Sequence, residues 1–123
     1  MKNARGFGVG VDIEDIGRFA ELRRVKDKLF LQKIFTSREL DYCFSKNDPA
    51  PHLAARFCAK EAIVKALHSL GESDMSYADI EIIKLSRGAP YVRFVREQND
   101  LHVSISLSHT KDIALASALA IRI

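Results

Sequence analysis

The chain has 123 residues, 47% of them hydrophobic and 28% charged, so we expect one globular domain over residues 1–123. A formal net charge of +3 is too small to indicate nucleic-acid binding by itself. The sequence contains neither the apolar run of a signal peptide nor a stretch of membrane-spanning length. We therefore expect a cytoplasmic protein without membrane contact.

The N-terminal part of the chain predicts one strand followed by helices. Residues 7–13, FGVGVDI, are short and rich in β-branched side chains, as in a strand. Apolar residues at helical spacing then predict three short helices, over 14–25, 26–35 and 37–46. Thr36, followed three residues later by Glu39, has the pattern of a capping box and supports the start of the third helix.

A long helix is expected over residues 51–70. It follows residues 47–51, NDPAP, whose turn-forming residues interrupt regular structure, and it precedes Gly71, which is placed to end it. Its apolar residues fall on one broad arc, and Lys60 lies inside that arc rather than opposite it. The ammonium of Lys60 either reaches water past apolar surface or serves a binding site.

The C-terminal part of the chain predicts a run of strands. Alternating or β-branched segments indicate strands over 78–85, 90–95, 101–108 and 113–123. The turn Gly88-Ala89-Pro90 separates the first two. One strand, a block of helices and then several strands indicate an α+β fold, with a mainly antiparallel sheet packed against the long helix and shorter helices.

Two cysteines, Cys43 and Cys58, lie within predicted helices and lack the spacing of metal ligands. We expect both thiols to be reduced and packed in the interior. Such cysteine usage suits a cytoplasmic protein.

Positive charge is concentrated in residues 18–28, where five basic residues stand against two acidic ones. A compact basic patch can attract an acidic macromolecule or a phosphorylated ligand, or it can simply be a solvated surface. The segment has few aromatic neighbours, only Phe19 and Phe30, so it does not favour single-stranded nucleic acid.

Two acidic residues are candidates for a metal site. Asp12, at the end of the first strand, is either a helix cap or a ligand. Glu61 either pairs with Lys65, one helical turn away, or joins Asp12 in binding Mg²⁺, which takes one or two carboxylates together with phosphate oxygens and water. In that second case Lys60 and Lys65 would meet phosphate oxygens beside the metal.

His109, in SLSHTKD, is either structural or a base or phosphate contact. The sequence contains no nucleophile elbow, Walker motif, dinucleotide-binding glycine pattern or zinc spacing. The residues by themselves lead to a Mg²⁺-dependent phosphate site with a basic docking surface as one interpretation, beside the structural alternatives given above.

Two segments in order, GVGVDIEDIGRF and FCAKEAIVKAL, resemble the paired signature of the 4′-phosphopantetheinyl transferases. TSRELDYC, YADIEI, GAPYV and SISLSHTKDIALA are similar to landmarks of the short branch of that family, the holo-[acyl-carrier-protein] synthases. The resemblance covers nearly the whole chain. It implies the 4′-phosphopantetheinyl transferase fold in a single copy.

The resemblance also implies a reaction. A serine hydroxyl of an apo acyl carrier protein attacks the β-phosphate of coenzyme A, the phosphopantetheine arm is transferred, and adenosine 3′,5′-bisphosphate leaves. The nucleophile belongs to the partner, which agrees with its absence from this sequence. The alternative is a non-catalytic module of the same fold that binds coenzyme A or a carrier protein.

By its resemblance to the family signature, the chain also matches the family's functional positions. Asp12 and Glu61 match the metal carboxylates for Mg²⁺, with Mn²⁺ as an alternative ion. Glu61, Lys65 and His109 are the expected catalytic residues. Contacts with coenzyme A are expected from Lys60, Lys65, His109, Arg56, Gly88 and Pro90.

Partners follow from the same resemblance. Arg18 matches an arginine that engages the carrier protein, and Arg23, Arg24 and Lys26 extend that surface by their charge alone. The longer branch of the family carries two copies of the fold with the site between them, whereas this chain has one. We therefore expect its active sites to lie between identical subunits, and the resemblance to the short branch implies a homotrimer.

Overall fold

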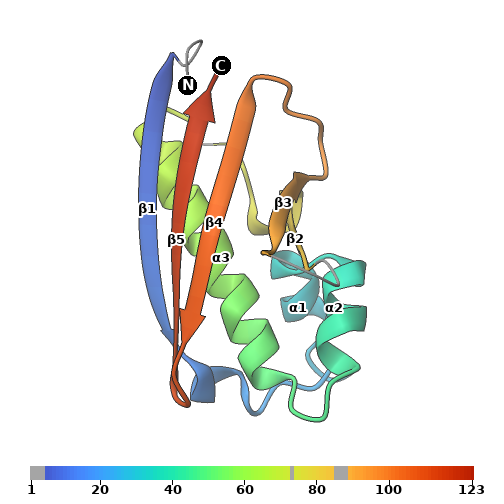
Figure 1. The fold of residues 1–123 in the computed structure, drawn as a ribbon. Helices are drawn as coiled ribbons and strands as arrows, with labels where there is room; N and C mark the ends of the chain where they lie inside the picture. Colours follow the sequence, from blue (N-terminus) through green and yellow to red (C-terminus); the bar gives the residue numbers. More distant parts are fainter. Residues whose placement is uncertain (1–4, 73, 85–88) are drawn as a thin grey trace.

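The computed structural model describes residues 5–72, 74–84 and 89–123, which form three layers (Figure 1). A three-stranded antiparallel sheet forms the first layer, and the long helix α3 (Ala50–Ser69) packs on one of its faces. The third layer, on the far side of α3, contains two short helices and a small two-stranded sheet. This arrangement confirms the α+β fold.

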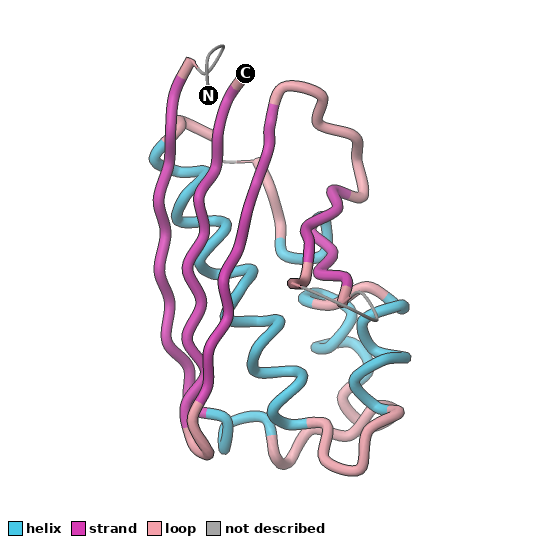
Figure 2. The backbone as a smooth tube through the Cα atoms, in the orientation of Figure 1, coloured by secondary structure: helices cyan, strands magenta, loops and turns pink. Residues whose placement is uncertain are grey.

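The strands form two antiparallel sheets, traced in Figure 2. The larger has the order β1-β5-β4, so the last strand lies between the first and the fourth. The smaller pairs β2 with β3. The bounds are β1 (Gly6–Asp15), β2 (Ile80–Ile83), β3 (Tyr91–Phe94), β4 (Leu101–His109) and β5 (Ile113–Arg122), which confirms every predicted strand.

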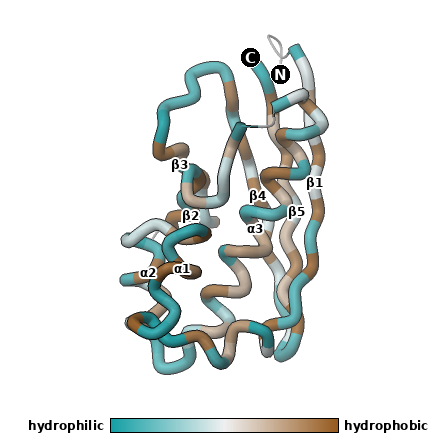
Figure 3. The backbone as a smooth tube through the Cα atoms, turned by 180° about the vertical axis from the view of Figure 1, so that it is seen from behind, coloured by the Kyte–Doolittle hydropathy of each residue, from teal (hydrophilic) through white to brown (hydrophobic). Residues whose placement is uncertain are grey.

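Helix α3 is buried on most of its sides because it has neighbours in both outer layers. It ends as predicted: Gly71 adopts a φ of 84°, a left-handed conformation that glycine accepts without strain. In Figure 3 hydrophobic segments recur along α3, α1 and the strands, whereas the loop between β3 and β4 is hydrophilic. None of the helices in the described ranges is long and apolar enough to span a membrane.

Two of the short helices occur where they were predicted. They are α1 (Lys28–Ile34) and α2 (Ser37–Phe44). The predicted capping box is present at the start of α2, where the Thr36 hydroxyl accepts from the Glu39 backbone and the Glu39 carboxylate accepts from the Thr36 backbone. Both cysteines are free and buried, as expected, and burial raises the pKa of Cys43 to about 11 and of Cys58 to about 12.

The predicted helix over residues 14–25 is wrong. Strand β1 continues to Asp15, because pairing with β5 extends to the last register position, Asp15 opposite Ile113. Only one short 3₁₀ turn, η1 (Ile16–Phe19), follows. Two of the apolar residues that suggested a helix, Ile16 and Phe19, lie in this turn and are buried against α3.

Strand β1 lies directly on α3, without a layer of side chains between them. A Cβ atom added to Gly8 would stand 1.9 Å from the carbonyl oxygen of Ala66, and one added to Gly10 would stand 1.9 Å from that of Ala62. Both distances are far below van der Waals contact, so only glycine fits at either position. The close approach brings the residues that follow Gly10 on β1 next to α3.

We predict that Gly10→Ala lowers the free energy of unfolding by about 1–3 kcal/mol or more, because strand and helix must move apart. Gly17→Ala is the matched control, since a Cβ at Gly17 meets no atom within 4 Å. Urea denaturation of both variants provides the comparison. Equal stability of the two variants would contradict the direct packing of β1 on α3.

Candidate functional site

Three acidic side chains lie in the region where β1 crosses α3, and we call Asp12, Glu14 and Glu61 the carboxylate cluster. Asp12 and Glu14 follow Gly8 and Gly10 at every second position of β1, so they share the face toward α3. Burial raises the pKa of Glu14, and the negative charges of Asp12 and Glu61 raise it further. The charges of the other two carboxylates therefore act on Glu14.

Each carboxylate of the cluster has one partner outside it. Lys65 Nζ lies 3.1 Å from Asp12 Oδ1 and donates to the carbonyl of Val11. The Arg18 guanidinium lies 2.6 Å from Glu14 Oε2. Glu61 Oε1 accepts a hydrogen bond from the hydroxyl of Tyr77. Lys65 thus forms its ion pair with Asp12 on β1. The alternative pair of Lys65 with Glu61 is not found among the ion pairs of the described residues.

The cluster fits a divalent cation. Asp12 Oδ2 is buried and has no hydrogen-bond partner within the described part of the chain, so it is an oxygen available to a ligand. No group of three or more His, Cys, Asp or Glu side chains in that part is arranged to hold an ion. Mg²⁺ does not need such a group, because one or two carboxylates with water and substrate phosphate complete its octahedron.

A separate cavity of about 320 Å³ brings together three of the predicted coenzyme-binding residues, Arg56, Pro90 and His109. We call it the basic cavity, because its lining includes basic side chains and no acidic one. Its complete lining is Tyr42, Pro51, His52, Ala55, Arg56, Ile82, Lys84, Pro90, Leu107 and His109. Gly88, also predicted to contact the coenzyme, lies outside the described residues.

Arg56 is the most enclosed charge of the basic cavity, with 6% of its surface exposed. Its guanidinium carbon lies 4.2 Å from the ring centre of Tyr42, and Nη1 donates to the carbonyl of His52 at 3.3 Å. Its Nε is buried without an acceptor among the described residues. Burial lowers the pKa of His52, and the positive charge of Arg56 lowers it further. The cavity therefore favours an anionic ligand.

The carboxylate cluster and the basic cavity lie on opposite sides of β5 within one chain. Asp12 is in register with Ala116 of β5, and Leu107 of the basic cavity is in register with the same residue from β4. Two strand spacings of about 4.8 Å separate their backbones by roughly 10 Å. The structure therefore brings Asp12, Glu61 and Lys65 together, and separately Arg56, Pro90 and His109.

Lys60 requires a correction. Its side chain is 0% exposed, so its ammonium reaches neither water nor a surface ligand. Nζ lies 2.6 Å from Glu39 Oε1, 2.7 Å from the carbonyl of Ile34 and 3.0 Å from that of Tyr77, which occupies all three of its protons. Burial lowers the pKa of this ammonium, and Glu39 opposes that effect. Lys60 is thus an interior charge, and we do not retain it as a coenzyme contact.

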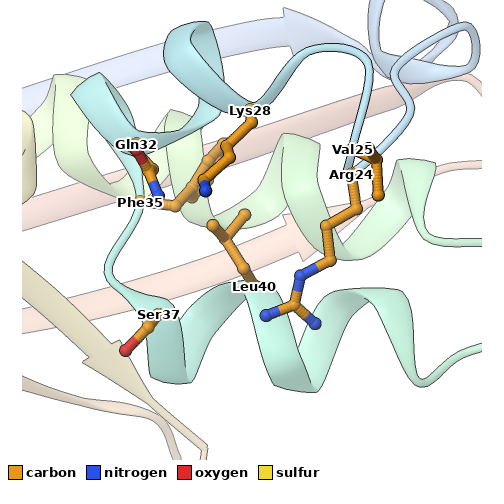
Figure 4. Close-up of a pocket in the computed structure, with 7 residues that line it drawn as sticks. All are labelled: Arg24, Val25, Lys28, Gln32, Phe35, Ser37 and Leu40. Atoms are coloured by element: carbon orange, nitrogen blue, oxygen red, sulfur yellow. The ribbon is translucent and has the colours of Figure 1, made fainter.

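The four basic residues predicted to bind a partner, Arg18, Arg23, Arg24 and Lys26, are all exposed. Beside Arg18 is an apolar hollow of about 120 Å³, with Phe19, Leu22, Phe30, Ile34 and Phe57 in its lining. A larger hollow of about 420 Å³ lies between α1 and α2, where Arg24 and Lys28 extend toward Leu40 (Figure 4). Arg24 also forms an ion pair with Asp41.

Glu14, Tyr77 and Lys84 are among the residues of these sites that were not predicted from the sequence. Glu14 had a usable signal, since it stands two positions after Asp12 in what proved to be the same strand. Tyr77 and Lys84 had none, because they enter the sites only through the packing of η2 (Tyr77–Asp79) and β2 against α3.

Comparison with known proteins agrees with this architecture. Residues 8–118 match the sequence model of the 4′-phosphopantetheinyl transferase superfamily. A holo-[acyl-carrier-protein] synthase of Chlorobaculum parvum is 40% identical over 111 residues, which cover 90% of this chain and 95% of that protein. The chain belongs to this superfamily.

Solved structures place the chain in the same branch of the superfamily. A holo-(acyl-carrier-protein) synthase from Bacillus anthracis, in complex with coenzyme A (3′,5′-ADP), matches with a TM-score of 0.76 and 27% identity over 94% of this chain and 96% of that one. The Helicobacter pylori synthase, in complex with coenzyme A, matches with a TM-score of 0.74 and 31% identity, covering 91% and 98%. The phosphopantetheinyl transferase fold expected from the sequence is therefore confirmed.

We predict that Lys60→Met lowers the free energy of unfolding by about 3–5 kcal/mol, because Glu39 keeps a buried charge without its cation. The double variant Lys60→Met with Glu39→Gln should recover part of that loss, since no unpaired charge remains. Lys33→Met, at an exposed position of α1, is the control and should change stability little. Stability is measured by denaturant titration. If Lys60→Met were as stable as the control, the ion pair between Lys60 and Glu39 would not be buried in solution.

Proposed function

We propose that this protein is a holo-[acyl-carrier-protein] synthase, which transfers the 4′-phosphopantetheine arm of coenzyme A to a serine of an apo acyl carrier protein. Membership of the superfamily supports the reaction class. The observation that carries the proposal is the carboxylate cluster beside Lys65, with the buried Asp12 Oδ2, which has no hydrogen-bond partner among the described residues. Carboxylates and an ammonium together suit a metal-bound diphosphate.

In the proposed reaction the serine hydroxyl loses its proton to solvent, its oxygen forms a bond to the β-phosphorus of coenzyme A, and the bond between that phosphorus and the bridging oxygen breaks. Adenosine 3′,5′-bisphosphate leaves with the bridging oxygen. A Mg²⁺ ion, or Mn²⁺ in its place, held by Asp12 and Glu61 would polarise the diphosphate and neutralise charge that develops on it. Lys65 supplies a second positive charge beside Asp12.

We assign the basic cavity to the phosphates of coenzyme A. Arg56, Lys84 and His109 supply its positive or hydrogen-bonding groups, and Arg56 Nε has no competing acceptor among the described residues. His109 lines this cavity at the end of β4, which favours its role as a phosphate contact over that of a base for the serine.

The active site is proposed to form between subunits of a homotrimer. One chain keeps the carboxylate cluster and the basic cavity on opposite sides of β5, so a neighbouring chain can complete each half. The outer face of the large sheet supports the assembly, because it exposes an apolar row that no other element of the described chain covers. That row consists of Phe7, Val9, Val11 and Ile13 on β1 and Leu115 on β5.

The carrier protein is proposed to bind at the basic segment that begins with Arg18. Exposed Arg23, Arg24 and Lys26 provide positive charge, and the apolar hollow beside Arg18 can take a nonpolar side chain of the partner. Charge around an apolar centre gives both fast encounter and a fixed orientation. The buried free thiols are consistent with the reducing cytoplasm as the compartment.

We predict that the purified protein, with Mg²⁺ and coenzyme A, raises the mass of an apo carrier protein by one phosphopantetheine group. Glu61→Gln should reduce the rate by at least about 100-fold, because it removes one charged ligand and keeps the shape of the side chain. Glu97→Gln, on the loop after β3, is the control and should act like the unchanged protein. Intact-protein mass spectrometry provides the measurement.

Turnover separates this proposal from the alternative, a non-catalytic module that binds coenzyme A or a carrier protein. With carrier in large excess over enzyme, the proposal requires many carriers modified per enzyme molecule. Binding without any mass gain, tested on carriers of several pathways, would favour the alternative. A salt-dependent shift with single-stranded DNA, and none with a carrier, would instead indicate a nucleic-acid-binding protein.

The assembly has its own test. Val11, 55% exposed on the apolar row, becomes buried in the proposed trimer, so Val11→Asp should give a monomer that has lost transfer activity. Val95 is 47% exposed and lies outside the row, so Val95→Asp should remain trimeric. Light scattering coupled to size-exclusion chromatography measures both. A fully active monomer would contradict an active site shared between subunits.

A further inference from the structure

Tyr77 touches both residues of the adjacent pair Lys60 and Glu61. Its hydroxyl donates to Glu61 Oε1, and its backbone carbonyl accepts from Lys60 Nζ at 3.0 Å. Lys60 points into the interior and Glu61 belongs to the carboxylate cluster, so Tyr77 is bound to two neighbouring residues of α3 that serve different surroundings. We propose that Tyr77 is a positioning residue that orients the Glu61 carboxylate for a divalent cation, an inference that rests on the function proposed above.

The hydrogen bond from Tyr77 restricts how Glu61 can turn. A glutamate side chain has several rotatable bonds and, if free, spreads its carboxylate over many orientations. With Oε1 held by the phenol, the direction of Oε2 is set as well. Carboxylates that ligate metals are themselves commonly held by such a hydrogen bond, and its loss typically weakens metal binding or activity about 10–100-fold.

Tyr77 can serve this role only if it is itself held in place, and three contacts hold it. Its ring packs edge-on against Phe57 with the ring centres 5.6 Å apart. Its carbonyl is bound by Lys60, which is anchored in turn by Glu39 at 2.6 Å. The turn that carries it is closed by Ser76, whose backbone and hydroxyl both donate to Asp79. The phenol is thus presented from a rigid support.

This arrangement gives Lys60 an indirect function. Since its ammonium is wholly enclosed, Lys60 cannot contact a ligand, yet it fixes the backbone from which the Tyr77 hydroxyl reaches Glu61. The ion pair with Glu39 and the carboxylate cluster are therefore connected through a single residue. A phenylalanine at position 77 would keep the ring packing and lose only the donor, so Tyr77→Phe isolates the proposed interaction.

The test compares Mn²⁺ binding to the full chain and to its Tyr77→Phe variant by isothermal titration calorimetry. Thermal unfolding is measured on the same samples, and binding is measured where both are folded. We expect the variant to bind Mn²⁺ about 10–100-fold more weakly, with a nearly unchanged melting temperature. Tyr91→Phe, at an exposed position of β3, is the matched control and should bind as the unchanged protein does. Glu61→Gln shows how much Mn²⁺ affinity is lost when the charged ligand itself is removed.

The outcomes separate this inference from the proposed function. If Tyr77→Phe binds Mn²⁺ within about two-fold of the unchanged protein, or if the unchanged protein binds none, the positioning role is overturned. Phosphopantetheine transfer by the unchanged protein would leave the proposed function standing in either case. Weakened Mn²⁺ binding by the variant, in a protein that transfers nothing to any carrier, would support the positioning role and refute the proposed function.

Discussion

The direct contact of β1 with α3 is the constraint on which the candidate site depends. Gly8 and Gly10 leave no room for a side chain against the carbonyls of Ala66 and Ala62, so strand and helix cannot slide or separate without losing the fit. Two residues further along β1, Asp12 is then held beside Glu61 and within 3.1 Å of Lys65. A larger side chain at either glycine would push strand and helix apart and so move Asp12 away from Glu61 and Lys65.

Helix α3 organises the rest of the molecule because its sides serve different neighbours. One side carries Glu61 and Lys65 to the carboxylate cluster, and Arg56 extends to the basic cavity. Lys60 faces the short helices and holds α2, η2 and the end of α1 together through Glu39, Tyr77 and Ile34. A buried ion pair gives little net stability, but it has strict geometric requirements, which suits a support for a precise site.

Much of this fold follows from local patterns, and the exceptions have physical causes. The strands and α3 were predictable because the periodicity of their apolar residues, and the Gly and Pro residues that bound them, agree with the tertiary structure. The helix predicted over 14–25 is absent at its start because Glu14 and Asp15 pair with β5, a contact across nearly the whole chain that overrides helical spacing. Lys60 could be flagged by periodicity, but its partner Glu39 lies 21 residues away, and no sequence pattern joins the two. Tyr77 was likewise unpredictable, because its role depends on a turn packed against α3.

In the proposed site Asp12 and Glu61 together bind the cation on which transfer depends. Crystals grown with Mn²⁺ and coenzyme A, and anomalous scattering measured from the manganese, test this cation binding directly. We expect one anomalous peak per chain within coordinating distance of both carboxylates, in contact with a phosphate oxygen of the coenzyme. Manganese bound elsewhere, or none at the carboxylate cluster while coenzyme A occupies the basic cavity, would contradict it.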